Sequence, residues 1–127
     1  MAISKELIRG HTDTIILNIL SQGDSYGYQV SKSIRLLSHQ QYELNEATLY
    51  TAFRRLEKGG AIASYWGDET QGARRKYYKI TTSGQQQLTT ALQEWEFAKD
   101  VISQLITGNM HEGVSLCHQL KWKYARV

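Results

Sequence analysis

Proline is missing from this chain, cysteine occurs once, and no long run of apolar residues is present. Without proline, one common obstacle to long helices is removed. The lone cysteine, Cys117, excludes an intrachain disulfide and argues against a small secreted scaffold stapled by disulfides. No stretch reaches the about 20 apolar residues of a membrane span, and the N-terminus lacks a signal-peptide pattern. We therefore expect a cytoplasmic protein.

Catalytic and metal-binding signatures are missing as well. The sequence has no P-loop, no H-E-x-x-H or G-x-S-x-G motif and no dinucleotide fingerprint. Nothing singles out a pair of catalytic carboxylates. His111, Cys117 and His118 do not have the spacing of a zinc site. We expect no enzyme activity, no cofactor and no metal.

The rest of the composition is typical of one globular domain. The chain has 127 residues, of which 41% are hydrophobic and 21% charged, and this length is enough to bury a core. Its net charge of +3 is unevenly distributed. Residues 44–80 hold seven basic and four acidic side chains, whereas residues 1–43 and 81–127 are each balanced at four and four. The excess either forms a solvated charged face or marks a surface for an anionic partner.

Residues 45–58 are predicted to form a helix with one polar face. Asn45 can cap its start, because its side-chain oxygen can accept from a backbone N–H of the first turn. Leu49, Phe53 and Leu56 recur on one apolar face, and the two glycines at 59 and 60 end the helix. Off the apolar face lie the side chains that we predict to contact nucleic acid: Thr48, Tyr50, Thr51, Arg54 and Arg55.

Some of these side chains have alternative interpretations. Tyr50 could instead be a half-buried packing residue. Arg54 and Arg55 could pair with Glu57 or Glu43, although exposed ion pairs add little stability.

A basic hairpin is predicted after this helix. Its strands, residues 61–66 and 74–80, are rich in Tyr, Trp and Ile, and a polar tip at 67–73 joins them. Arg74, Arg75 and Lys76 are predicted to contact phosphates, and Gln71 at the tip is predicted to bind DNA because it and Gly72 let the backbone approach closely. Neighbours in a strand project to opposite faces, so Arg75 and Lys76 are not expected to touch DNA equally. Trp66 is interpreted as structural.

The remaining elements are predicted to be helical. Residues 4–21 form a first helix that is apolar nearly all round in its second half. Residues 26–38 form a second helix, capped by Ser25, and the last long helix starts at a capping box of Thr82 and Gln85. With the polar-faced helix and the hairpin, this order is the winged helix-turn-helix arrangement. We predict a mainly α fold with a small β-hairpin and a long C-terminal helix.

That last helix carries an apolar seam with coiled-coil spacing. The seam residues are Leu88, Ala91, Trp95, Ala98, Ile102 and Leu105. The seam either packs on the protein's own first helix or meets its copy in a second chain. We favour a homodimer, because Trp95 is large and the small Ala91 and Ala98 leave space around it. The predicted domains are a DNA-binding domain at 1–80, a dimerisation helix at 81–108 and a tail at 109–127 that forms either a short helix or a loose segment.

Three segments resemble the PadR family of bacterial transcriptional regulators. They are L-N-E-A-T-L-Y-T-A-F-R-R-L-E-K-G-G, S-Y-W-G-D-E and Q-G-A-R-R-K-Y-Y-K-I-T, and with the final helix they match in order and spacing over roughly residues 3–107. Within the family, the chain is most similar to the short multidrug-responsive, LmrR-like subgroup. The resemblance implies a winged helix that dimerises through its last and first helices and usually represses transcription.

The same resemblance implies a ligand site. In LmrR-like proteins, flat aromatic compounds stack between the two copies of one tryptophan in a pore at the dimer centre. Trp95 matches that tryptophan, and Ala91 and Asn18 match other pore-lining positions. Thr14 replaces an aliphatic residue and Lys99-Asp100 reverses an Asp-Lys pair, so the ligand's identity is not implied. The predicted ligand-binding residues are Trp95, Ala91, Asn18, Thr14, Lys99 and Asp100.

The sequence thus predicts a DNA-binding transcriptional repressor that a planar aromatic molecule, bound at the dimer interface, releases from its operator. Its partners would be a double-stranded DNA operator and a second copy of the chain, with no membrane involved. Two alternatives stay open. One is a winged-helix protein that binds DNA or RNA without a ligand, and the other is a protein-interaction module on the same fold.

Overall fold

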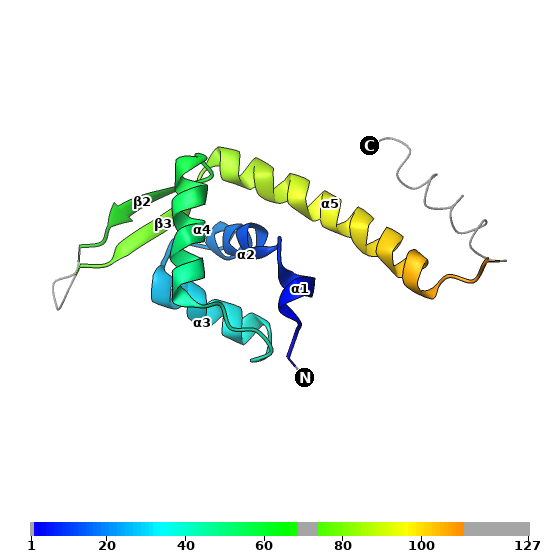
Figure 1. Ribbon diagram of the computed structural model, residues 1–127. Coiled ribbons are helices and arrows are strands. Elements are labelled where there is room, and N and C mark those ends of the chain that lie inside the picture. The colour runs from blue at the N-terminus through cyan, green and yellow to red at the C-terminus, as the bar shows by residue number, and fades with distance from the viewer. Residues whose placement is uncertain (1, 69–73, 111–127) are drawn as a thin grey trace. The chain divides into compact units, whose positions relative to one another are not determined.

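The computed structural model describes residues 2–68 and 74–110. They form mainly helices with one small antiparallel sheet of strand order β1-β3-β2 (Figure 1). In chain order the elements are α1 (Lys5–Ile8), α2 (Thr12–Ser21), β1 (Ser25–Tyr26), α3 (Gly27–Leu37), α4 (Glu46–Lys58), β2 (Ile62–Trp66), β3 (Lys76–Ile80) and α5 (Thr82–Thr107). The predicted fold class, a winged helix-turn-helix followed by a long C-terminal helix, is confirmed.

The chain divides into two compact units. The first comprises residues 1–88, and the second begins at Thr89, so α5 starts in the first unit and continues into the second. Most of the predicted hairpin tip, including Gln71, and residues 111–127 of the predicted tail lie outside the described residues. Across residues 2–68 and 74–110, none of the helices has the length and apolar character needed to cross a bilayer.

The prediction of one helix over residues 4–21 is wrong. The chain forms α1 and α2 instead, and Gly10 between them has φ +92°. This left-handed conformation interrupts a helix and is easily adopted by glycine. Ser4 caps the short α1, since its hydroxyl accepts from the Glu6 N–H at 3.2 Å.

The prediction that Ser25 caps the second helix is also wrong. Ser25 belongs to β1, where it is buried and pairs with Tyr78 of β3. The N-cap position of α3 is occupied by Tyr26, whose side chain makes no capping hydrogen bond. A strand of two residues is too short to show the alternation that identifies strands in a sequence.

Helix α4 forms as predicted at both ends. The Asn45 side chain accepts from the Thr48 N–H at 3.0 Å. At the other end, Gly60 has φ +81° and its N–H donates to the Glu57 carbonyl at 3.1 Å, while the Ala61 N–H donates to the Leu56 carbonyl at 2.9 Å. This pair of bonds is the Schellman motif, and it turns the chain directly into β2.

The start of α5 is capped one residue earlier than predicted. Thr81, not Thr82, accepts from the Gly84 N–H at 3.0 Å. The Thr81 hydroxyl also donates to the Gly60 carbonyl at 2.6 Å. The end of α4 and the start of α5 are therefore tied to each other, which the local capping pattern did not indicate.

The core of the first unit gathers apolar side chains from α2, α3, α4, the sheet and the start of α5. Its buried members are Ile16, Leu17, Ile19, Leu20, Val30, Ile34, Leu44, Leu49, Ala52, Phe53, Leu56, Ala61, Ile62, Tyr78 and Leu88. Phe53 of α4 stacks on Tyr78 of β3, with ring centroids 4.1 Å apart. This contact fixes the position of α4, and with it the polar face of the helix, relative to the hairpin.

Gly84 provides a test of this packing. A Cβ at this position would collide with the Ala61 carbonyl oxygen and come within 2.8 Å of Ile80 Cγ1. Ala in a helix is ordinarily more stable than Gly by about 0.5–1 kcal/mol, but overpacking costs about 1–3 kcal/mol. We therefore expect Gly84→Ala to lower the free energy of unfolding, measured by urea denaturation. Ser83→Ala, at the exposed neighbouring position, is the control and should unfold like the wild type. An unchanged or raised midpoint for Gly84→Ala would contradict the close contact.

Candidate nucleic-acid interface

The exposed face of α4 carries a short polar chain of contacts. Thr51 donates its hydroxyl to the Ala47 carbonyl at 2.8 Å. Arg54 donates from Nη2 to the Thr51 hydroxyl at 3.2 Å. Thr48, Thr51 and Arg54 are all exposed. The face that the sequence predicted to be polar is therefore accessible, with the Arg54 guanidinium partly oriented by its own helix.

Tyr50 combines exposure with packing. It is 37% exposed, and its ring meets Phe53 edge-on at a centroid distance of 5.7 Å. The ring also lies against Gly27 of α3, where a Cβ would clash with the tyrosine hydroxyl and approach Cζ to 2.9 Å. Glycine at position 27 thus lets the Tyr50 side chain bridge the two helices of the helix-turn-helix.

A groove lies beside Tyr50, between α3 and the first half of α4. Its volume is about 510 Å³. The lining residues are Gly27, Tyr28, Ser31, Arg35, Glu43, Leu44, Asn45, Glu46, Leu49 and Tyr50. The exposed Tyr28 is a member of this groove that the sequence analysis did not single out.

Arg55 has a partner that the sequence did not predict. Its Nε donates to Asp13 Oδ2 at 3.1 Å, and its Nη2 donates to Asp13 Oδ1, so a bidentate pair joins α4 to α2. This hydrogen bond raises the pKa of Arg55. Both side chains are partly exposed, so the pair orients α4 more than it stabilises the fold.

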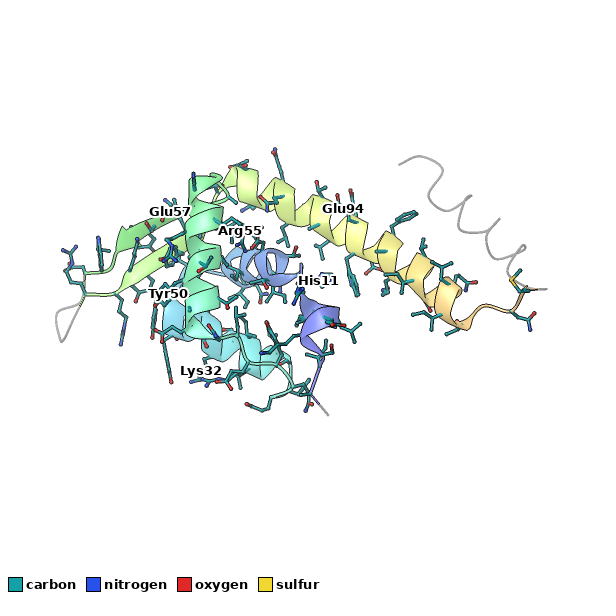
Figure 2. The ribbon with its side chains drawn as sticks, in the orientation of Figure 1. His11, Lys32, Tyr50, Arg55, Glu57 and Glu94 are labelled. Carbon is teal, nitrogen blue, oxygen red and sulfur yellow. The ribbon has the colours of Figure 1, made fainter. Side chains whose placement is uncertain are left out.

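The two carboxylates proposed as alternative partners are engaged elsewhere. Glu57 accepts from the Ser64 hydroxyl of β2, and Glu43 lies 3.7 Å from Arg35 of α3. Arg55 and Glu57 are on opposite sides of α4 (Figure 2). The alternative in which Arg54 or Arg55 pairs with Glu57 or Glu43 is therefore not found, since Arg55 pairs with Asp13 and Arg54 donates to Thr51. Asp13 gave no signal in the sequence, because it lies 42 residues from Arg55.

The three basic residues at and just before the start of β3 each lie over an aromatic ring. The Arg74 guanidinium carbon is 5.8 Å from the Trp66 ring centroid, and that of Arg75 is 4.7 Å from the Tyr26 ring. Lys76 Nζ is 5.8 Å from the Tyr78 ring. Distances under about 6 Å allow cation–π attraction. The charges of the hairpin are thus held at its surface by the strands themselves.

A row of tyrosines supports the hairpin on one face. Tyr77 of β3 stacks with Tyr65 of β2 at 5.6 Å and meets Tyr26 of β1 edge-on at 5.4 Å. The Tyr65 hydroxyl donates to Asp24 Oδ2 at 2.6 Å, and this hydrogen bond raises the pKa of Tyr65. The row spans all three strands. Sequence reasoning missed it because the register of β1 on β3 was not predicted.

Tyr78 links the hairpin electrostatically to α4 on the other face. Burial raises its pKa, the nearby Glu57 carboxylate raises it further, and the Arg54 charge opposes both. Arg54 on α4 and Lys76 on β3 therefore both lie within electrostatic reach of one buried ring.

The residues predicted for dimerisation and ligand binding fall into both units. Leu88 is buried in the core of the first unit. On α2, Thr14 is half-buried and Asn18 is exposed. Further along α5, Ala91, Ala98 and Asp100 are half-buried, whereas Trp95, Ile102 and Leu105 are exposed. Lys99 Nζ lies 2.8 Å from Glu96 Oε2 on the same helix.

Metal-binding side chains do not gather in the described part of the chain. Within residues 2–68 and 74–110, no group of three or more His, Cys, Asp or Glu side chains could hold an ion. The residues weighed as zinc ligands, His111, Cys117 and His118, lie outside the described residues.

Comparisons with known proteins give the family. The family model of PadR-like transcriptional regulators matches residues 16–90. An uncharacterized protein of Lysinibacillus sphaericus is 40% identical over 106 residues, covering 84% of this chain and 97% of that protein. The structure of a transcriptional regulator from Clostridium thermocellum is 49% identical with a TM-score of 0.77, covering 84% of this chain and 100% of that chain.

One solved structure of the same fold contains DNA. Bacillus subtilis PadR, in complex with operator DNA, is 24% identical with a TM-score of 0.57, covering 63% of this chain and 46% of that chain. The family model spans more than half of the present sequence, and the Lysinibacillus relative aligns over most of it. The chain therefore belongs to the PadR-like family of transcriptional regulators, and it is a regulator and not an enzyme.

Proposed function

We propose that this chain is a cytoplasmic, homodimeric transcriptional repressor that reads its operator with α4 and contacts phosphates with the β2–β3 hairpin. The main supporting observation is that the exposed face of α4 and the basic hairpin are linked. The exposed Thr51 and Arg54 on α4 are joined, through the stack of Phe53 on Tyr78, to a hairpin that presents Arg74 and Lys76. A helix can enter the major groove while a basic hairpin follows the adjacent backbone.

Within this proposal, the DNA-contacting residues have different roles. Tyr50, Thr51 and Arg54 enter the major groove of the DNA and contact bases. Thr48, at the start of α4, lies beside them. Arg74 and Lys76 contact phosphates from the face of the hairpin that packs against α4, and Arg75, which lies over Tyr26 on the opposite face, contributes less. Arg55 contributes mainly by holding α4 to Asp13. The Bacillus subtilis PadR complex with operator DNA supports duplex DNA as the partner, since that protein has the same fold.

The first experiment measures DNA binding directly. Duplexes would be selected by the protein from a random-sequence pool, and their affinities measured by fluorescence anisotropy at several salt concentrations. Arg54→Ala should weaken binding to the selected duplex more than to an unrelated one, because a base contact costs about 1–3 kcal/mol of discrimination. Lys76→Ala should weaken both and reduce the salt slope by about 1, as one lost phosphate contact does.

The control for Arg54→Ala removes a positive charge elsewhere on the same helix. Lys58→Ala, at an exposed position in the last turn of α4, should keep the discrimination between the selected and the unrelated duplex. Equal affinity for all duplexes in the wild type would contradict the operator proposal and favour an architectural protein. No binding to any duplex would favour a protein-interaction module.

Dimerisation is proposed from the apolar side chains of α5. Ile102 and Leu105 are 49% and 80% exposed, and the nearby Leu92 and Ile106 are exposed too. Apolar side chains concentrated along one helix usually mark an interface, and twofold dimers are the commonest closed assembly. A dimer also supplies two reading helices for two half-sites about one helical turn apart.

Sedimentation velocity checks the dimer. The wild type should sediment as a dimer at micromolar concentration. Ile102→Glu/Leu105→Glu should sediment as a monomer, because two buried carboxylates would be desolvated in the interface. Gln93→Glu, an exposed position on the same helix, should leave the dimer intact. A monomeric wild type would contradict the proposal.

We further propose that Trp95 binds a planar aromatic ligand that releases the repressor from DNA. Trp95 is 42% exposed, and Ala91 and Ala98, about one turn away on either side, are too small to cover it. Two indoles across a dimer can sandwich a flat ring, each contact contributing ~1 kcal/mol beyond burial. Lys99 and Asp100, on the same helix, would supply polar groups at its edge. Planar cations fit best, because indole faces attract positive charge.

Tryptophan fluorescence tests the ligand site. With Trp66 and Trp122 replaced by Phe, the emission of Trp95 should be quenched by a planar cationic dye. The dye should also weaken DNA binding, which requires a difference in dye affinity between the two dimer shapes. Trp95→Ala should lose dye binding and keep DNA binding. If Trp95→Ala binds the dye as tightly as the protein with Trp95, or if the dye does not change DNA binding, the ligand proposal is contradicted. The protein would then be a repressor that is not released by this ligand.

A further inference from the structure

Trp66 lies on the face of the sheet that packs against α4, but beyond the helix. Three successive cross-strand pairs share this face: Ile62↔Ile80, Ser64↔Tyr78 and Trp66↔Lys76. The middle pair contacts α4, because Tyr78 stacks on Phe53 and Ser64 donates to Glu57. The outer pair lies about 7 Å further along the strands, and there Trp66 is 57% exposed. Figure 1 shows the hairpin extending past α4.

The hairpin is held from its opposite face. Tyr65 and Tyr77 stack there, Tyr26 closes the row, and the Tyr65 hydroxyl is anchored on Asp24. The Gly67 N–H donates to the Arg75 carbonyl at 2.8 Å and joins the strands just beyond Trp66. These contacts do not involve the Trp66 indole. A large aromatic side chain exposed at the end of a sheet therefore has room for an external partner.

Two basic side chains lie next to Trp66. Arg74 lies 5.8 Å from its centroid, and Lys76 is its cross-strand neighbour. Lys76 also lies over Tyr78, whose ring is within reach of the Arg54 charge on α4. A basic line therefore runs from the exposed face of α4 to the outer end of the hairpin, with Trp66 between its last two cations. Such a surface complements a polyanion.

We propose that Trp66 contacts duplex DNA, with its indole packed against the sugar–phosphate backbone between the phosphates bound by Arg74 and Lys76. This inference rests on the proposed DNA-binding function. It gives a binding role to Trp66, which the sequence analysis interpreted as a structural residue. The indole ring offers apolar surface to a deoxyribose, and its N–H is a donor for a phosphate oxygen. Contacts to sugar and phosphate position the protein and carry no base information. Trp66 therefore affects affinity for all duplexes and sets how far the hairpin reaches along the backbone.

The test combines affinity with tryptophan emission on the selected duplex. Adding this duplex should change the emission of the wild-type protein, and the change should be lost in Trp66→Phe. Trp66→Phe should weaken binding by about fivefold or more, the size expected of a contributing interface residue, for selected and unrelated duplexes alike. Its salt slope should stay that of the wild type, because no cation is removed. Trp66→Tyr, which keeps a hydrogen-bond donor, should recover part of the affinity.

Two lysines of the same strand provide a matched control. Lys76→Ala should reduce the salt slope by about 1. Lys79→Ala, at an exposed position on the opposite face of β3, should leave both slope and affinity unchanged.

Each remaining outcome is decisive. If Trp66→Phe binds DNA as tightly as the wild type and shows the same change in emission, the Trp66 contact is overturned and the DNA-binding function stands. An equal or larger emission change with single strands would replace it with a base-stacking platform. Failure of the wild type to bind any duplex would overturn the proposed function itself.

Discussion

The stack of Phe53 on Tyr78 is the contact on which the arrangement of the exposed surface depends. Phe53 is almost fully buried, and its ring lies nearly parallel to that of Tyr78, at an interplanar angle of 16°. Because one ring comes from α4 and the other from β3, the stack fixes the helix against the hairpin. Tyr50 meets Phe53 on one side and Lys76 lies over Tyr78 on the other. The groups proposed to read bases and to hold phosphates are thus positioned by one buried aromatic pair.

Two polar contacts set the rotation of α4 around this stack. Asp13 holds Arg55 on one side of the helix, and Ser64 donates to Glu57 on the other. Partly exposed contacts of this kind add little to the free energy of unfolding. They are directional, however, and they fix which face of α4 is left to the solvent. The charged residues of α4, the helix proposed to read the operator, are therefore divided between orienting the helix and remaining available to a partner.

The sequence predicted the elements with local signals and missed those without them. Asn45 and the glycine pair at 59 and 60 identified both ends of α4, because caps are formed by residues a few positions apart. The strand β1 has two residues and owes its existence to pairing with β3, so Ser25 was read as a helix cap. Gly10 lies between two apolar stretches that read as one helix until its positive φ is known.

What the sequence determined by itself is therefore the order of the longer helices and the hairpin, the polar face of α4, the charge of the hairpin and membership of the PadR-like family. These depend on periodicity, capping and motif spacing, which are properties of neighbouring residues. Only the tertiary structure decided that Arg55 pairs with Asp13, that Tyr65 is anchored on Asp24 and that Trp66 is exposed beyond α4. The paired residues are 42 and 41 positions apart, and the exposure of Trp66 depends on how much of the hairpin α4 covers. The physical reason is that cross-strand register and the packing of helices on the sheet bring together residues that are far apart in the sequence. A local pattern cannot predict which of these distant residues will be in contact.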